Sequence, residues 1–240
     1  MIKEAIEYLF NKGTEEFGSL EVEGKTYITG NASMIEEPRV NKAFLLTTLT
    51  GIVDYINNAV DVKEVGREMT IHIDDPNTVS IYSQLNDERK REQLVIAKAI
   101  LPNVVYDRFL ESENFIIELM SKFEPTEDRE KVLKLFGCIK SEQVHKSMDD
   151  GLSQTVTAKK GISTVAEMEV PNPVTLAPYR TFPELPQPTS KFVLRLQDGP
   201  EAALFNAGGT SWRVEAMQSI KEYLDEGINP ELKEFVKIIM

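Results

Sequence analysis

Cysteine and histidine are scarce in this 240-residue sequence, which contains one cysteine and two histidines. A single thiol, Cys138, cannot form an internal disulfide, and this composition fits a reducing compartment. Cys138 also lies toward the C-terminal end of an apolar helical stretch, where the helix dipole disfavours a thiolate. Because cysteine and histidine are so few, and no Gly-x-Ser-x-Gly motif accompanies the serines, we predict a core thiol, no catalytic residue, no metal and no cofactor.

Long apolar runs are also missing. No segment reaches the ~20 apolar residues that a membrane helix needs. Glu4 and Glu7 interrupt the N-terminal stretch that would have to be apolar in a signal peptide. We therefore expect a cytoplasmic protein that does not contact a membrane.

Basic side chains are fewer than acidic ones, 27 against 39, which gives a formal net charge of -12. Such a charge repels the phosphates of nucleic acids and anionic lipid surfaces. A basic cluster, Arg89-Lys90-Arg91, is nearly cancelled by Asp87, Glu88 and Glu92, as in a solvated charged turn. No direct binding to duplex DNA is expected.

Two periodicities are present, and together they predict an α+β fold with antiparallel hairpins, packed helices and a central helical hairpin. Alternating apolar and polar residues predict strands, with the strongest hairpin over residues 69–82 and a turn at Asp75-Pro76-Asn77. Residues 94–100 fit either a strand or a helix. The remaining strands are expected over residues 20–23, 25–28, 155–157 and 164–170 and in a C-terminal hairpin over residues 192–205.

Helical spacing predicts a short helix over residues 3–11, a longer buried one over residues 40–59 and two between residues 104 and 140. Thr126 is the expected N-cap of the second helix of that pair. A helix from about Ser211 to Gly227 follows, and residues 231–239 predict a weaker one. The apolar stripes expected on these helices are Phe109, Ile116, Met120 and Phe123; Val132, Leu135, Phe136 and Ile139; and Val214, Met217, Ile220 and Leu224.

This pattern divides the chain into an N-terminal α+β region (1–102), a helical segment (103–150) and a C-terminal β-rich region with terminal helices (151–240). One continuous domain is the alternative. Six prolines between Pro171 and Pro188 forbid a helix or a central strand there, and predict an extended, proline-rich arm on the surface.

Two motifs resemble functional sites without meeting their requirements. Gly24-Lys25-Thr26 resembles the end of a phosphate-binding loop, but the spacing from Gly18 is one residue too long and a strand follows where a helix is required. His72 and Asp74 share one strand face and offer a base with its orienter, or two metal ligands. His145, Asp149 and Asp150 lie in a segment with the composition of a linker or frayed helix end, and nothing in the spacing requires them to join that pair.

The residues best suited to binding are Tyr179, Arg180 and Phe182, because a planar guanidinium sits between two aromatics on a stiff arm. Trp212 and Arg213, at the start of the later helix, are their expected companions. The alternative interpretation is packing, in which the two aromatics anchor the arm and Arg180 pairs with an acidic neighbour.

Three blocks of sequence carry a family resemblance. They are APYRTFPELPQPTSKFVLR (177–195), the ALF at 203–205 before Gly208-Gly209, and WRVEAMQSIKEYL (212–224), with a looser match over residues 83–102. The chain resembles the YfdQ-like proteins, uncharacterised proteins of phages and prophages, over about two thirds of its length. The resemblance implies a phage or prophage origin and a cytoplasmic location in the infected or lysogenic host cell. It transfers no catalytic residue.

Two functional hypotheses follow. The first is a non-catalytic phage or prophage accessory protein that acts through protein–protein contacts, inhibiting a host factor or a defence system or indirectly supporting phage DNA metabolism. Its partner would be a host or phage protein, and homo-oligomers are a further expectation. The second is an enzyme or sponge that binds a small anionic ligand such as a nucleotide, using arginines and helix N-terminal amides.

Overall fold

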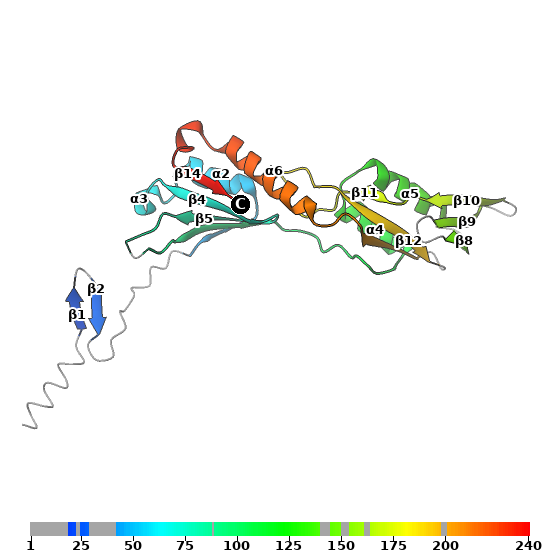
Figure 1. Cartoon of the computed structure of the whole chain (residues 1–240), viewed down its shortest axis with the longest axis horizontal. Helices are drawn as coiled ribbons and strands as arrows, with labels where there is room; N and C mark the ends of the chain where they lie inside the picture. Colours follow the sequence, from blue (N-terminus) through cyan, green and yellow to red (C-terminus); the bar gives the residue numbers. More distant parts are fainter. Residues whose placement is uncertain are drawn as a thin grey trace, which may run out of the picture. The chain divides into compact units, whose positions relative to one another are not determined.

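The computed structural model describes residues 19–22, 25–28, 42–87, 89–139, 145–149, 154–160, 164–197 and 201–240. The chain divides into two units, Met1–Lys42 and Ala43–Met240. In the first unit, β1 (Ser19–Val22) and β2 (Lys25–Ile28) form the predicted antiparallel pair. The helix expected over residues 3–11 lies outside the described residues. The second unit combines helices with antiparallel and mixed sheets, which confirms the α+β prediction (Figure 1).

A five-stranded sheet with the order β14-β4-β5-β6-β3 organises part of the second unit. The predicted hairpin forms its centre as β4 (Met69–Asp75) and β5 (Thr78–Ser83), and the amide of Asn77 donates to Asp75 Oδ1 (2.8 Å) in the turn. β6 (Gln93–Lys98) pairs antiparallel with β5, so the segment left open between helix and strand is a strand. The edge strands β3 (Phe44–Leu46) and β14 (Val236–Ile239) run parallel to β6 and β4.

Both edge strands correct a predicted helix. The helix expected over residues 40–59 is only α2 (Leu49–Asn57), which begins after Thr48, whose hydroxyl accepts from the amide of Gly51 (3.3 Å). The helix expected over residues 231–239 is replaced by a 3-10 turn, η1 (Pro230–Leu232), followed by β14. In each case pairing with a strand distant in sequence outweighs the local helical spacing.

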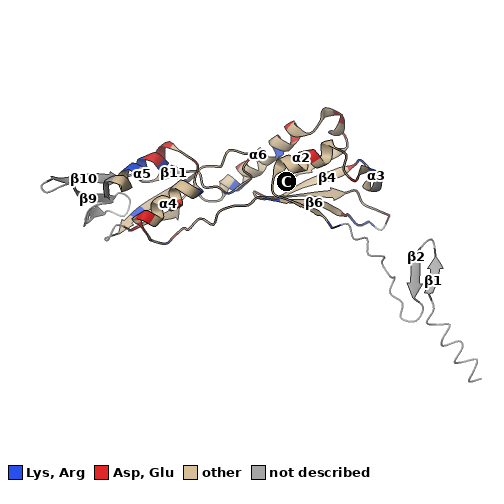
Figure 2. Ribbon diagram, turned by 180° about the vertical axis from the view of Figure 1, so that it is seen from behind, with Lys and Arg blue, Asp and Glu red and all other residues tan. Residues whose placement is uncertain are grey.

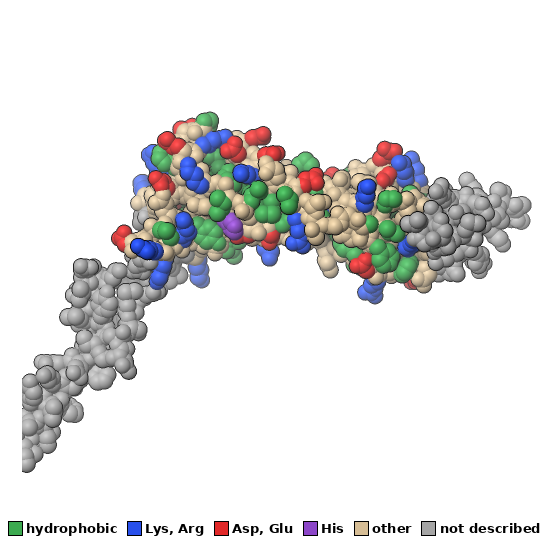
Figure 3. Space-filling view, in the orientation of Figure 1, with side chains coloured by type: hydrophobic (Ala, Val, Ile, Leu, Met, Phe, Trp, Pro, Cys, Tyr) green, Lys and Arg blue, Asp and Glu red, His purple; other side chains and the backbone are tan. Residues whose placement is uncertain are grey.

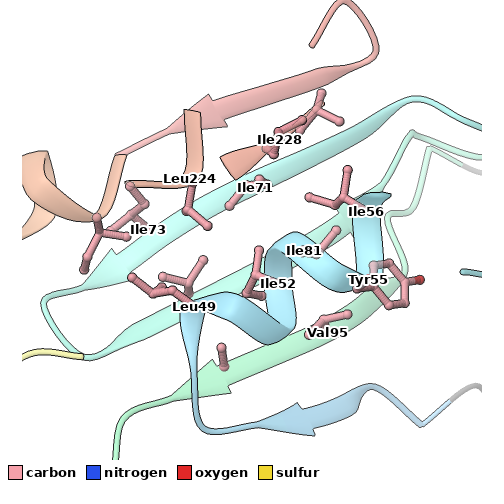
Figure 4. Packing of buried hydrophobic residues seen from close by; sticks show 14 of the residues in the cluster. Leu49, Ile52, Tyr55, Ile56, Ile71, Ile73, Ile81, Val95, Leu224 and Ile228 are labelled. Atoms are coloured by element: carbon pink, nitrogen blue, oxygen red, sulfur yellow. The ribbon is translucent and has the colours of Figure 1, made fainter. Parts of the chain in front are cut away.

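Helices α2 and α6 (Ser211–Gly227) pack on one face of this sheet, and a short helix, α3 (Val62–Val65), precedes β4. Figure 4 shows Leu49, Ile52, Leu224 and other labelled side chains between the helices and the strands. Of the stripe predicted on α6, Ile220 and Leu224 are fully buried, whereas Val214 is 68% exposed. The two helices approach closely at Gly227, where an added Cβ would lie 2.9 Å from a methyl carbon of Val53.

A four-stranded sheet, β11-β12-β13-β7, carries the second core. The predicted C-terminal hairpin forms β12 (Ser190–Gln197) and β13 (Glu201–Asn206), flanked by β11 (Val174–Leu176) and β7 (Leu110–Glu111). The helical hairpin α4 (Ser112–Lys122) and α5 (Glu127–Ile139) packs against it, and Figure 2 shows acidic and basic positions mixed along α5. Thr126 is the N-cap of α5, since its Oγ1 accepts from the amide of Arg129 (3.2 Å).

The apolar stripe predicted for the first helix of this pair is partly wrong. Phe115 and Leu119 are the buried apolar residues of α4, while Met120 is 59% exposed. Phe123 is buried as predicted, as are Val132, Leu135 and Phe136 on α5. The side chains of Cys138 and Ile139 lie outside the described residues, so the prediction of a core thiol is not addressed.

A third sheet consists of β8 (His145–Asp149), β9 (Gln154–Lys160) and β10 (Thr164–Val170) in the order β10-β9-β8. β9 and β10 contain the two predicted strands. β8 corrects the expectation of a linker or frayed helix end over residues 145–149. The sheets do not follow the predicted divisions at residues 102 and 150, because β14 at the C-terminus pairs with β4 and β7 pairs with β13.

The proline-rich arm is extended, as predicted, but it does not lie on the surface. Val174 and Leu176, in the edge strand β11, belong to the second core, whereas Phe182 and Leu185 belong to the first. Thr181 Oγ1 donates to the carbonyl of Pro76 (2.6 Å) in the β4–β5 turn. The arm therefore packs into both cores of the second unit.

Candidate functional site

Two places in the second unit carry the side chains that the sequence selects for function. The first surrounds Arg180 in the arm and the beginning of α6. The second lies on β4, β5 and β6, on the side of the five-stranded sheet opposite α2 and α6.

Arg180 brings the arm and α6 together. Its guanidinium carbon lies 4.0 Å from the ring centroid of Trp212, and that of Arg213 lies 5.5 Å from the same ring. The fold thus brings together the three residues that the sequence named as companions. Cations at such distances from an indole ring are attracted to its electron-rich face.

The polar atoms of Arg180 are mostly occupied by the chain itself. Nη2 donates to the carbonyl of Pro188 (2.6 Å) and to Ser190 Oγ (2.7 Å), and the Arg180 amide donates to Gln187 Oε1 (2.8 Å). Of the Arg180 side-chain nitrogens, Nε alone is buried without a hydrogen-bond partner among the described residues. Arg180 therefore clamps the arm to the first residue of β12 and to α6, and its contacts are with a carbonyl and a hydroxyl where the packing interpretation expected an acidic neighbour.

Burial sets the electrostatics of this cluster. It lowers the pKa of the Arg180 guanidinium to about 10, although the nearby carboxylate of Glu215 acts in the opposite direction. Burial also raises the pKa of the Tyr106 phenol, whose ring stacks on Phe192 with 5.6 Å between centroids. Arg180 keeps its positive charge and Tyr106 its proton at neutral pH.

Tyr179 and Phe182 hold the arm in place, as the packing interpretation expects. The amide of Tyr179 donates to the carbonyl of Lys122 (2.9 Å), which ties the arm to the end of α4. Phe182 has no exposed surface and packs in the core between α2, α6 and the sheet. Phe182 therefore does not present its ring to a partner in this fold. Arg213 and Val214 are exposed and Trp212 is partly exposed, which leaves the start of α6 accessible.

A polar network lies on the other side of the five-stranded sheet. His72 Nδ1 and Asp74 Oδ1 are 2.6 Å apart, and Ser80 Oγ donates to Asp74 Oδ2 (2.6 Å). Gln93 Nε2 donates to Ser80 Oγ (3.1 Å) and to the Tyr82 hydroxyl (3.3 Å). Alternation along the strands brings these side chains to one face, and their bonds hold each in place.

This network contains the residue types of a Ser-His-Asp catalytic triad, but they are not hydrogen-bonded in the order that a triad requires. A serine nucleophile needs its hydroxyl on the histidine, whereas the Ser80 hydroxyl is bonded to Asp74 and Ser80 is only 2% exposed. His72 and Asp74 are bonded to each other, as a base and its orienter would be. Among the residues that the structure describes, no three His, Cys, Asp or Glu side chains are grouped to hold a metal ion, and the side chain of His145 is outside them.

We call the side of the sheet opposite α2 and α6 the outer face. Its residues are Leu45, Thr70, His72, Asp74, Thr78, Ser80, Tyr82, Gln93, Ile96, Lys98, Lys237 and Ile239. Leu45 and Ile239 at its two edges are 79% and 49% exposed. Figure 3 shows a histidine over this sheet with hydrophobic side chains beside it. Sequence reasoning missed this surface, because the edge strands that complete it were predicted to be helical.

No helix in the described part of the chain is long and apolar enough to cross a membrane. In comparisons with known proteins, no family model matches the chain, and no curated protein or solved structure is significantly similar to it. The resemblance to the YfdQ-like proteins gains no support from these comparisons and enters only the proposal that follows.

Proposed function

We propose that this chain is a non-catalytic accessory protein of a phage or prophage that acts in the host cytoplasm by binding a host or phage protein. The observation that carries the proposal is the surface at the start of α6. There Trp212 is partly exposed and stacked by Arg180, and exposed Arg213 and Val214 lie beside it. We call Trp212, Arg213 and Val214 the α6 patch.

The α6 patch has the features of a protein-binding hot spot. Tryptophan and arginine are the side chains enriched among residues whose truncation costs an interface about 2 kcal/mol or more. Stacking on Arg180 fixes the indole before binding, so less conformational entropy is lost when a partner docks. An exposed valine, 68% accessible, adds apolar area beside the ring.

A capture experiment from infected or lysogenic host cells tests this proposal. The bait is the full chain, compared with a double variant, Arg213→Ala with Val214→Ser, that leaves Arg180 and Trp212 in place. A matched control, Ile117→Ser with Met120→Ser, removes exposed apolar side chains of α4, which are 56% and 59% exposed. The proposal expects specific proteins that the wild type and the control retain and the α6 variant loses. Equal capture by all three baits contradicts it.

A second candidate, binding of a small anionic ligand, is favoured by one observation. Arg213 is exposed at the N-terminus of α6, and the first turn of that helix contains no acidic residue. A ligand present at about 100 times its Kd stabilises a protein by ~2.7 kcal/mol. Thermal-shift measurements with ATP, GTP and cyclic nucleotides, on the wild type and on Arg213→Ala, separate the two candidates. A shift that Arg213→Ala abolishes supports the anionic ligand, and a flat response in the wild type rejects it.

A further inference from the structure

The outer face of the five-stranded sheet is arranged in cross-strand rows. The middle row is Ile239, His72, Ser80, Ile96 and Leu45, in register from β14 to β3. It is apolar at both ends, and His72 and Ser80 at its centre are both hydrogen-bonded to Asp74. In the next row along the strands, Thr78 pairs with Lys98 on one side and with Asp75 on the other, and Asp74 lies beside Asp75 in the β-bulge after Ile73.

From this pattern we infer that the outer face binds a second copy of the same chain, sheet against sheet. A two-fold axis parallel to the strands and above β5 lays β4 of one copy over β6 of the other, and β14 over β3. This inference uses a different surface from the α6 patch and does not rest on the proposed function.

The rotation makes the face complementary to itself. Ile239 of each copy falls opposite Leu45 of the other, so both exposed apolar edges are covered. Asp74 falls opposite Lys98 of the other copy, so both charges meet a partner of opposite sign. Symmetry makes each favourable pair occur twice, as in any isologous dimer.

The network at the centre of the face is compatible with this contact. Asp74 accepts from Ser80 and is bonded to His72, yet a carboxylate has about four acceptor sites and can receive a lysine as well. Ser80 Oγ and Gln93 Nε2 already have partners, so covering these two atoms leaves neither of them unsatisfied. Aligned packing of two sheets tolerates the ~30° rotation that sheet twist introduces.

The size of the face indicates a weak dimer. Five strands at a spacing of ~4.8 Å span about 19 Å, and the outward residues from Thr70 to Asp74 span about 14 Å. Such an area falls below the ~800 Å² per partner of a standard stable interface. We therefore expect association that depends on concentration, and a face that also tolerates water in the monomer.

The test uses two single substitutions at exposed positions of the full chain, Leu45→Arg and Ile239→Glu. Each alone places a charge opposite an apolar side chain twice per dimer, and should weaken dimerisation about tenfold or more. Mixed in equal amounts, the two variants form a heterodimer in which the introduced arginine meets the introduced glutamate once and the native apolar pair forms once. Dimerisation should then recover. Ile117→Arg on α4 is the control, since Ile117 is similarly exposed and lies off the outer face.

Sedimentation velocity from roughly 10 μM to roughly 1 mM reads out the result. A wild-type dimer that is weakened in each single variant, kept in the control and restored by mixing supports the inference. A monomer at every concentration overturns it. A dimer that neither substitution weakens uses another surface and also overturns it, as does a failure of mixing to restore association. Lys98→Glu provides an independent check, because it sets a second carboxylate against Asp74 of the other copy and should weaken the dimer as well.

Discussion

The side chain of Gln187 holds together the part of the arm that carries Arg180, and replacing it tests how this loop is stabilised. Its Oε1 accepts from the amides of Arg180 (2.8 Å) and Thr181 (3.1 Å). Its Nε2 donates to the carbonyls of Phe182 and Leu185, each at 3.2 Å. Gln187 is 7% exposed, so water does not readily replace these bonds.

We expect Gln187→Leu to lower the free energy of unfolding by about 3 to 5 kcal/mol. A buried donor or acceptor left without a partner costs ~1–3 kcal/mol. The amides of Arg180 and Thr181 lose the acceptor that Gln187 provides, whereas the Phe182 carbonyl still accepts from the amide of Leu185 (3.2 Å). Two to three backbone groups therefore lose their hydrogen-bond partner and carry the full cost of being buried without one. Partial entry of water keeps the total loss of stability below the maximum that these costs add up to.

Urea unfolding followed by tryptophan fluorescence measures this change, because Trp212 is the only tryptophan and stacks on Arg180. The midpoint should fall at an unchanged slope if the folded and unfolded states keep their compactness. Gln218→Leu is the matched control, since Gln218 lies on α6 and bonds to Glu222 (2.9 Å) at the surface, and it should stay within ~0.5 kcal/mol of the wild type. A loss of less than about 1 kcal/mol in Gln187→Leu would refute the reasoning that the four bonds organise the loop.

Three other substitutions test further contacts. Arg180→Lys should lower the free energy of unfolding by ~1–3 kcal/mol and shift the fluorescence emission of Trp212 to longer wavelength. The reason is that lysine cannot both stack on the ring and reach Pro188 and Ser190. Unchanged emission would contradict the role of Arg180 in holding the arm to α6. Gly227→Ala should destabilise the fold by ~1–3 kcal/mol, because the added Cβ meets the side chain of Val53. Adding Val53→Ala to this variant should recover most of the loss. Gly137→Ala is the control in the same urea assay: it adds a Cβ to an open helix surface and should stabilise the fold by up to ~1 kcal/mol. The amide of Thr175 holds the pKa of Asp128 below its usual value, so this carboxylate stabilises the fold above its ordinary pKa and that stability disappears as the pH falls through the lowered one. Asp128→Asn should therefore flatten the acid limb of a stability–pH curve, and an unaltered limb counts against the assignment.

The elements that the sequence predicted correctly are those whose partners are close in the chain. The β4–β5 hairpin follows from alternation and from the Asp75-Pro76-Asn77 turn, and the α4–α5 pair follows from apolar spacing and the Thr126 cap. Each of these signals lies within a few residues of the contact it specifies. Local periodicity is sufficient information in such cases.

The wrong predictions concern short edge strands with distant partners. β14 pairs with β4 across more than 160 residues, and β3 pairs with β6 across about 50. Neither strand has enough residues to establish an alternating pattern, and each adjoins a segment with helical spacing. The outer face could not be foreseen for the same reason, since it exists only after both edges are added to the predicted hairpin.

The sequence predicted part of the candidate site, but it did not indicate which of the side chains are buried. The sequence named Trp212 and Arg213 as companions of Arg180 in binding, and the structure places the Arg180 guanidinium over the Trp212 ring. The burial of Phe182 and the engagement of Arg180 with Pro188 and Ser190 depend on the path of the arm. Proline content indicates that a segment is extended, but it does not indicate whether the segment is covered.

Proline content does explain why this arm can be covered. A buried segment outside regular structure must pair its backbone groups, and each proline removes one donor that would need a partner. The six prolines between Pro171 and Pro188 therefore lower the demand for acceptors along the arm. Other donors are paired one at a time: the amide of Thr175 with Asp128, that of Tyr179 with Lys122, and those of Arg180 and Thr181 with Gln187. The same prolines that argue against a sheet interior let an irregular chain run between two cores, and they leave Gln187 as the side chain on which that arrangement most depends.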